Sequence, residues 1–188
     1  AQEVSAASGS SSYGSQPCAE VDSCKGNGDT IWWYENTDGS GNKWKAHKIA
    51  TMTKPMHLAS GDIDDDGDMD LFFVSEEHGL GWIEMLDQVG ESEREWEVHR
   101  IEQDLMVHPS FVLQKDMNGD GLLDVLVASE KEDVIAWFKN EEYGKRFQGH
   151  KVHEGHPLFR VKSLAVDDFD RNGKIEIIAS SFFNSKLV

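Results

Sequence analysis

A nine-residue acidic motif occurs three times in the chain, and this repetition restricts the possible folds more than any other feature of the sequence. The three copies begin at Asp62, Asp116 and Asp168, so successive copies start 54 and 52 residues apart. Self-similarity at a period of this length indicates a repeat architecture, in which each unit packs against its neighbours to complete a core. We therefore expect a series of similar units from residue 31 onward.

Two further segments recur in phase with the acidic motif. One has the pattern aromatic-x-x-His-basic-aliphatic and occupies Trp44–Ile49, Trp96–Ile101 and Phe147–Val152. The other is rich in aromatic residues and occupies Ile31–Asn36, Gly81–Leu86 and Ile135–Asn140. Three independent markers with one period are difficult to obtain by chance, so the repeat is a property of the whole region.

Each repeat unit contains four segments with strand character. The recurring aromatic and His-containing segments supply two of them, and the other two flank the acidic motif on either side. The segments that precede the motif alternate or are apolar: Met56–Ser60, Phe111–Leu113 and Val161–Val166. The segments that follow it are apolar and rich in β-forming residues: Asp70–Val74, Asp124–Ala128 and Glu176–Ala179. No helical period is sustained over ten residues, so the sequence predicts an all-β fold.

Units of about 50 residues with four antiparallel strands are typical of β-propeller blades. We predict about three blades, made of two complete units and a half unit at each end of residues 31–188. Since three blades cannot enclose a channel and open sheet edges promote aggregation, we expect these residues to be part of a larger propeller. Further repeats of a longer chain are the favoured completion, and a protein partner is the alternative.

Residues 1–30 differ in composition from the repeats. They are rich in Ser, Gly and Ala and contain one aromatic residue, Tyr13, so they cannot bury much apolar surface. We expect an extended arm in which Cys18 and Cys24 close a small disulfide loop, as in an oxidising compartment; two unpaired thiols are the alternative. The start Ala1-Gln2-Glu3 is of the kind left by signal-peptide cleavage, so we expect a secreted, extracellular or lumenal protein.

The acidic motifs place side-chain oxygens at positions 1, 3, 5 and 9, with glycine at position 6. Several carboxylates so close together repel each other unless a hard cation lies among them, and all-oxygen ligands around a sharp glycine bend suit Ca²⁺. Mg²⁺ retains more of its waters. At position 7 the side chains differ, which is expected if the backbone carbonyl binds. We predict two to three Ca²⁺ ions and these ligands: Asp62, Asp64, Asp66, Asp68, Asp70, Asp116, Asn118, Asp120, Leu122, Asp124, Asp168, Asp170, Asn172, Lys174 and Glu176.

An EF-hand loop and a solvated hairpin turn are two other interpretations of the motif. An EF-hand begins in the same way but needs a glutamate at position 12, where this chain has Phe73, Val127 and Ala179, and it needs flanking helices. The EF-hand therefore does not fit. Solvated hairpin turns would explain one Asp-Gly pair, but not the same four oxygen positions in three copies.

The loop and its period resemble the FG-GAP/VCBS repeats, over about residues 31–188. These repeats form the blades of integrin-α-type β-propellers and of many secreted proteins. The resemblance implies a Ca²⁺ ion that joins the first two strands of each blade, and a role in adhesion, ligand binding or scaffolding. In the third loop, Arg171 lies beside the metal position and Glu176 stands where aspartate is usual in the family, which implies a weaker or an empty site there. The Phe-Gly and Gly-Ala-Pro signatures are not evident, so the chain lies nearer the VCBS-type branch.

The charge and the known motifs exclude several function classes. With 18 Lys and Arg against 35 Asp and Glu, the net charge of −17 opposes nucleic-acid binding, and no apolar run is long enough to insert into a membrane. Nucleophile-elbow, Walker A and dinucleotide motifs are absent. His153 and His156 are one residue short of the zincin spacing, and His47, His99 and His150 have the regularity of packing positions. We expect no enzyme activity, with a glycan-binding lectin or a propeller-type polysaccharide lyase as the alternative.

Overall fold

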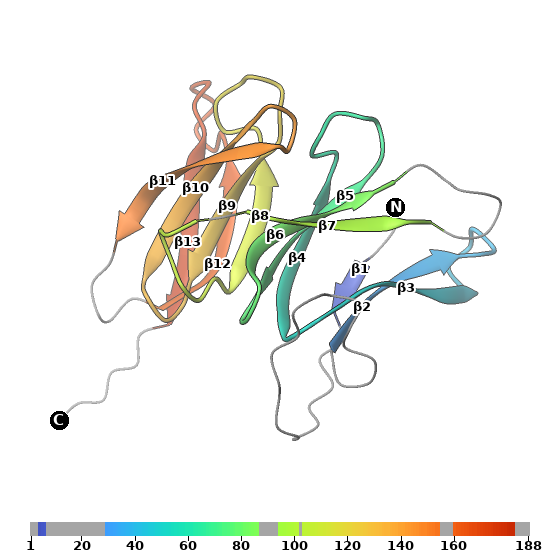
Figure 1. Ribbon diagram of the computed structural model, residues 1–188. Coiled ribbons are helices and arrows are strands. Elements are labelled where there is room, and N and C mark those ends of the chain that lie inside the picture. The colour runs from blue at the N-terminus through green and yellow to red at the C-terminus, as the bar shows by residue number, and fades with distance from the viewer. Residues whose placement is uncertain (1–3, 7–28, 87–93, 102, 155–159, 183–188) are drawn as a thin grey trace.

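The computed structural model describes residues 4–6, 29–86, 94–101, 103–154 and 160–182, and its regular secondary structure in these ranges is entirely β-strand (Figure 1). Within this described part, no helix is long and apolar enough to cross a membrane. The strands are β1 Val4–Ala6, β2 Asp29–Asn36, β3 Trp44–Met52, β4 Pro55–Gly61, β5 Asp70–Ser75, β6 Gly79–Met85, β7 Trp96–Arg100, β8 Phe111–Lys115, β9 Asp124–Ser129, β10 Val134–Glu141, β11 Arg146–Glu154, β12 Arg160–Asp167 and β13 Glu176–Phe182.

These strands form antiparallel sheets in which sequence neighbours pair. Two sheets have four strands, in the orders β4-β5-β6-β7 and β8-β9-β10-β11. A two-stranded sheet, β12-β13, and a three-stranded sheet, β1-β2-β3, lie on either side of them in the sequence. The predicted all-β fold with four-stranded propeller blades is confirmed, with two complete blades and two partial ones.

The apolar runs that follow the acidic motifs form the central strands of the two complete blades. All six residues of β5 and all six of β9 are buried, because both faces of each strand pack against another sheet. On β5, Phe72 and Val74 face the blade that follows, and Leu71 and Phe73 face the sheet that precedes. The hydrophobic core is therefore divided into three clusters, one at each junction between successive sheets.

Polar contacts join the blades as well. The Lys115 ammonium lies 3.2 Å from Asp167, which connects β8 to β12. The buried Asn140 side chain on β10 donates to the backbone carbonyl of Ile63 at 2.7 Å, across to the preceding blade. Apolar clusters and specific hydrogen bonds thus set the position of each blade against the next.

The predicted N-terminal arm lies mostly outside the described residues, and so do Cys18 and Cys24. The described part of the arm, β1, pairs antiparallel with β2 and matches Val4 to Trp33 and Ala6 to Ile31. This segment adds a strand to the first sheet, which the composition of residues 1–30 did not indicate.

Candidate metal centre

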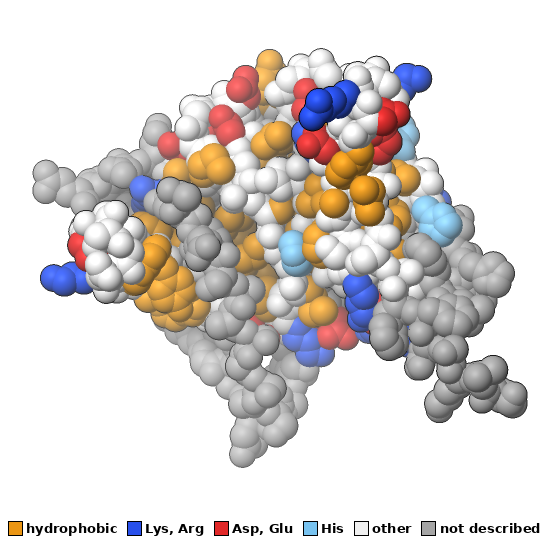
Figure 2. All heavy atoms as spheres, turned by 180° about the vertical axis from the view of Figure 1, so that it is seen from behind, with side chains coloured by type: hydrophobic (Ala, Val, Ile, Leu, Met, Phe, Trp, Pro, Cys, Tyr) orange, Lys and Arg blue, Asp and Glu red, His pale blue; other side chains and the backbone are white. Residues whose placement is uncertain are grey.

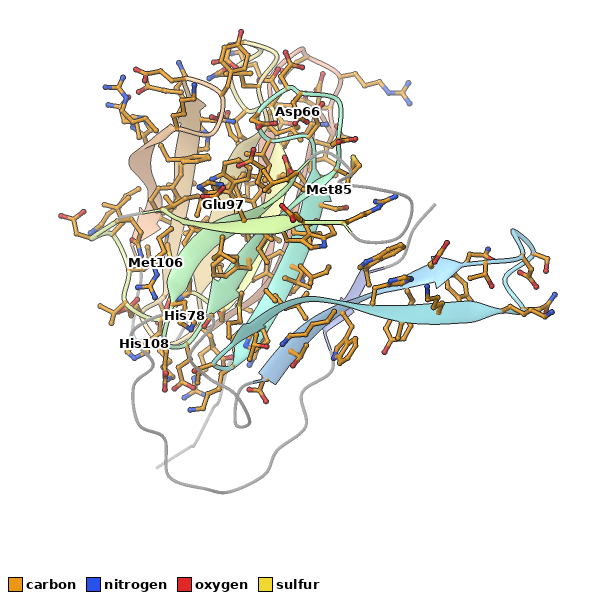
Figure 3. The ribbon with its side chains drawn as sticks, turned by 45° about the vertical axis from the view of Figure 1, so that its right-hand side comes forward. Asp66, His78, Met85, Glu97, Met106 and His108 are labelled. Atoms are coloured by element: carbon orange, nitrogen blue, oxygen red, sulfur yellow. The ribbon has the colours of Figure 1, made fainter. Side chains whose placement is uncertain are left out.

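The three acidic motifs form the loops between β4 and β5, β8 and β9, and β12 and β13. All three loops lie at the same end of the molecule, and the β4–β5 loop carries Asp66 at this end (Figures 1 and 3). Several acidic side chains are also visible at this end from behind (Figure 2). The repeat places the loops there because each connects the first two strands of its blade.

The carboxylate at position 1 organises each loop through backbone amides. Asp62 accepts hydrogen bonds from the amides of Asp66 and Gly67, both at 3.1 Å. Asp116 and Asp168 accept from the equivalent amides of their own loops, at positions 5 and 6. The position 1 carboxylate therefore holds the bend of the loop.

Glycine at position 6 is required by the backbone conformation. Gly67, Gly121 and Gly173 have φ angles of 96°, 91° and 83°, which is the left-handed region that other residues adopt only with strain. Position 4 is left-handed too, and it is occupied by Asp65 in the first loop and Arg171 in the third. The recurring glycine thus has a conformational reason that does not depend on any ligand.

In the two complete blades, the acidic residue at position 9 is the most deeply buried of the predicted ligands. Asp70 is 1% exposed and accepts hydrogen bonds from the amides of Ile63 at 3.0 Å and Met85 at 2.9 Å. Burial raises the pKa of Asp70 to about 6, and the two amide hydrogen bonds partly offset this effect. Asp124 repeats the arrangement with Met117 and Asn140. This carboxylate joins the loop to the third strand of the blade.

In the first loop, three carboxylates converge. One oxygen of each of Asp62, Asp64 and Asp70 lies within 4.8 Å of the others. The Asp64 Oδ1 atom is buried and has no hydrogen-bond partner. Burial raises the pKa of Asp64, and the nearby Asp66 and Glu84 carboxylates add to this effect. This site combines converging oxygens, a buried oxygen without a hydrogen-bond partner and several neighbouring carboxylates.

The third loop brings Asp168, Asp170 and Glu176 together in the same way, also within 4.8 Å. Glu176 accepts a hydrogen bond from the Phe169 amide at 2.9 Å, as Asp70 does from Ile63. The longer glutamate therefore performs the role of the position 9 aspartate. The loop is more exposed than the first, since Asp170 lies at the surface.

The second loop differs from the other two. The Asp120 carboxylate accepts a hydrogen bond from the Asn118 side chain at 3.0 Å, and the Lys139 ammonium lies 3.4 Å from it. A hydrogen bond from the Leu122 amide is the main cause that lowers the pKa of Asp120. The Lys139 ammonium thus lies beside the second loop, at the position on the third strand that Glu84 has beside the first loop.

The remaining predicted ligands lie elsewhere in the loops. Asp66 and Asn172 use side-chain oxygens to accept the amides of the position 7 residues Asp68 and Lys174, and Asp120 does the same for Leu122. The carbonyl ligands proposed at position 7 stay a prediction. The sequence pattern did not indicate Glu84 and Lys139, although both occur at the same register of the third strand.

The recurring histidines stack on tryptophans. His47, His99 and His150 lie directly across from Trp33, Trp82 and Trp137, with ring centroids 4.3 to 4.9 Å apart. In the first two pairs the imidazole also contacts a glutamate, Glu35 or Glu84. Stacking across the sheet explains why the histidine and the aromatic strand recur together.

These features define a class of protein built from β-propeller blades with an acidic loop between the first and second strands. Residues 20–73 and 116–179 match the FG-GAP-like repeat, which is more than half of the chain. The protein therefore belongs to the FG-GAP-like repeat family, as its sequence resemblance indicated. A search of curated proteins found no match.

Proposed function

We propose that the chain is a calcium-binding propeller module in which the acidic loops hold two to three Ca²⁺ ions. The geometry of the first loop is the main support for this proposal: three carboxylates converge there, and Asp64 Oδ1 is buried without a hydrogen-bond partner. A buried polar atom of this kind is costly unless something pairs with it. A hard cation satisfies the oxygen and removes the repulsion between the carboxylates.

The ion would stabilise the blade through the ligands that span it. Asp62 holds the bend of the loop, whereas Asp70 is bonded to the amide of Met85 on the third strand. An ion bound by both would connect the loop to strands β5 and β6. Calcium binding is then coupled to folding: because the ion binds the folded loop, it raises the free energy of unfolding of the blade.

We propose an extracellular or lumenal role in binding, adhesion or scaffolding. The excess of acidic residues gives a net charge of −17, and a large net charge keeps a protein soluble, as an extracellular role requires. Extracellular calcium modules bind at about 10⁻⁴–10⁻³ M, which such a medium supplies. The partner is a protein or further repeats that complete the propeller.

A glycan-binding role is the second candidate, and one cavity favours it. The cavity has a volume of about 780 Å³ and lies between the β6–β7 edge of one blade and the β10–β11 turn of the next. Aromatic and basic side chains line it, among them Tyr143, which is 53% exposed, and Arg146. Aromatic rings pack on sugar rings, and cationic groups bind acidic sugars.

Thermal unfolding with and without calcium tests the calcium proposal. Millimolar Ca²⁺ should raise the melting temperature over that in EGTA, since free ligand at 100 times the dissociation constant adds about 2.7 kcal/mol. Asp64→Asn should reduce the shift, whereas Glu77→Gln, at an exposed site outside the loops, should not. Identical melting curves in Ca²⁺ and EGTA would refute the proposal.

The glycan role is tested separately with acidic polysaccharides. If calorimetry detects binding of an acidic polysaccharide and Arg146→Ala weakens that binding, the result supports a lectin. Release of unsaturated sugars from the polysaccharide would indicate a lyase. Absence of both with the calcium-loaded chain would contradict the second candidate and leave the first standing.

A further inference from the structure

Three potential metal ligands lie together on the outer two strands of the first complete blade. Glu84 is on β6, and Glu97 and His99 are on β7 (Figure 3 labels Glu97). One ligand atom from each lies within 4.8 Å of the other two. Glu84 is the direct cross-strand partner of Glu97, and His99 is two residues further along β7, so the three side chains share one face of the sheet.

The imidazole of this group is held in place by its neighbours. Its ring stacks on Trp82, with the centroids 4.5 Å apart, and its Nε2 atom lies 2.6 Å from a Glu84 oxygen. Glu84 and His99 are partly buried, with side chains 22% and 32% exposed, whereas Glu97 lies at the surface. Two ligands are therefore positioned in advance, and the third is free to turn toward them.

The two other described sheets that have equivalent strands lack this combination. The cross-strand pair equivalent to Glu84 and Glu97 is Glu35 with Lys45 in the preceding sheet, and Lys139 with Gln148 in the following blade. The first of these pairs has opposite charges, and the second has only one charged member. Like charges directly opposite each other destabilise a sheet, and a cation bound between the Glu84 and Glu97 carboxylates would remove this repulsion.

The space beside the group accommodates the rest of a coordination shell. Glu84 and His99 both line the cavity of about 780 Å³ that lies between the two complete blades. A metal held by three protein ligands keeps a position open for water or another ligand. The cavity provides that position, because it opens beside two of the three ligands.

We propose that Glu84, Glu97 and His99 bind one divalent transition-metal ion of the Zn²⁺ class, separately from the acidic loops. The imidazole nitrogen distinguishes this donor set from the all-oxygen loops, since imidazole suits zinc and its neighbours whereas Ca²⁺ takes oxygen ligands. Bonds of about 2.0–2.2 Å require ligand atoms no more than about 4.4 Å apart. The three ligand atoms lie within 4.8 Å of one another, and because Glu97 is exposed its side chain has room to turn closer to the other two.

Calorimetry with Zn²⁺, on the full chain in millimolar Ca²⁺ that keeps the acidic loops saturated, tests the proposal. The unchanged chain should bind one Zn²⁺ ion at this site, and Glu97→Gln should weaken that binding at least about tenfold, because loss of even an outer partner of a ligand costs that much. The substitution introduces the residue that the following blade has at this position, so the strand pair should still form. An unchanged calcium-dependent melting temperature would show that it does.

A second variant tests for a gain of binding. Lys45→Glu places a carboxylate opposite Glu35 and beside His47, and it thereby reproduces the donor set in the preceding sheet. This variant should bind one Zn²⁺ ion more than the unchanged chain. Equal affinity for Zn²⁺ before and after Glu97→Gln, no binding by the unchanged chain, or no added ion in Lys45→Glu would each overturn the proposal.

Discussion

Asp70 and Asp124 carry a carboxylate into the interior of their blades, and each one accepts hydrogen bonds from amides of the loop and of the third strand. The residues beside the two loops differ in charge. In the first blade, burial and the nearby carboxylates, including Glu84, raise the pKa of the loop residue Asp64. In the second blade, the Lys139 ammonium lies 3.4 Å from the loop residue Asp120. At the scale of single residues, the loops therefore share a backbone design and differ in electrostatics.

Replacement of Lys139 is expected to strengthen calcium binding at the second loop. In Lys139→Ala no ammonium competes with Ca²⁺ for Asp120, and the gain should be a few-fold, since an exposed ion pair contributes about 0.2–1 kcal/mol. Calorimetry with Ca²⁺ measures this, with Lys145→Ala as the control for loss of one positive charge at the surface. Weaker binding by Lys139→Ala would show that the lysine supports the site.

Calcium affinity is also expected to fall from the first loop to the third. The first offers four carboxylates at positions 1, 3, 5 and 9, whereas Asn118 and Asn172 replace one in each of the others and Arg171 adds a positive charge to the third. Calorimetry on Asp64→Ala, Asp120→Ala and Asp170→Ala assigns the sites. Loss of the tightest site in Asp170→Ala would contradict this order.

At the scale of the strands, Asn140 on β10 joins several elements through its side chain. Its buried side chain donates to the carbonyls of Ile63 and Leu123 and accepts from the amide of Gly144. The strand thereby connects the acidic loops of two blades with its own turn. Asn36 is the equivalent residue on β2, but its side chain accepts one hydrogen bond, from Gly41, at the surface.

Asn140→Ala should destabilise the protein markedly more than Asn36→Ala. The substitution removes the side-chain partner of three backbone groups, two of which are buried, and each unsatisfied buried group costs about 1–3 kcal/mol. Urea unfolding of the calcium-loaded variants measures the difference. Equal loss of stability in the two variants would mean that the contact between blades contributes nothing beyond the common fold.

The junction between β4 and β8 is expected to make stability depend on pH. The His57 ring contacts the Phe111 ring across this junction in a tilted arrangement, with the centroids 4.1 Å apart, and burial lowers the pKa of His57 below its usual value. The folded protein therefore favours the neutral imidazole, so this contribution to stability is complete above the unfolded pKa of about 6.5 and is lost as the pH falls below it. His57→Gln should flatten the decline in unfolding free energy between about pH 7 and pH 5. A profile as steep as that of the unchanged protein would assign the decline to other groups.

The whole molecule consists of sheets stacked in sequence order, with an apolar cluster at every junction. Among the described strands, β13 pairs on one side only, with β12, and Ile178 on it is 53% exposed. A strand edge with an exposed apolar residue promotes association with other chains. We propose the partial blades as the places where further repeats or a protein partner bind.

The chain is therefore expected to self-associate as its concentration rises, and Ile178→Lys should reduce this association, since a charge on an edge strand opposes pairing. Light scattering over a concentration series measures it. Val107→Lys introduces the same charge at an exposed apolar residue in a loop, and it should have little effect. A monomer at every concentration for the unchanged chain would contradict the expectation.

The local pattern of the sequence was sufficient for the all-β fold, the four strands of each repeat, the FG-GAP-like family and the positions of the acidic loops. The strands and the acidic loops depend on residues within about ten positions of one another, such as Asp62 and Gly67, whose hydrogen bond lies inside the loop. The blade architecture and the family follow from the recurrence of these local patterns, with the acidic motifs 54 and 52 residues apart. The proposed calcium ligands Asp62, Asp64 and Asp70 were also identified in this way, and the structure brings their oxygens together.

The tertiary structure decided what depends on residues far apart in the chain. Strand register places Glu84 opposite Glu97, and Lys139 near Asp120, and packing between blades brings Asn140 to Ile63, 77 residues away. The pairing of β1 with β2 likewise joins segments with no common pattern. A repeat period specifies which residues are equivalent, but the charge and burial of each equivalent site depend on its neighbours across the sheet and on the next blade.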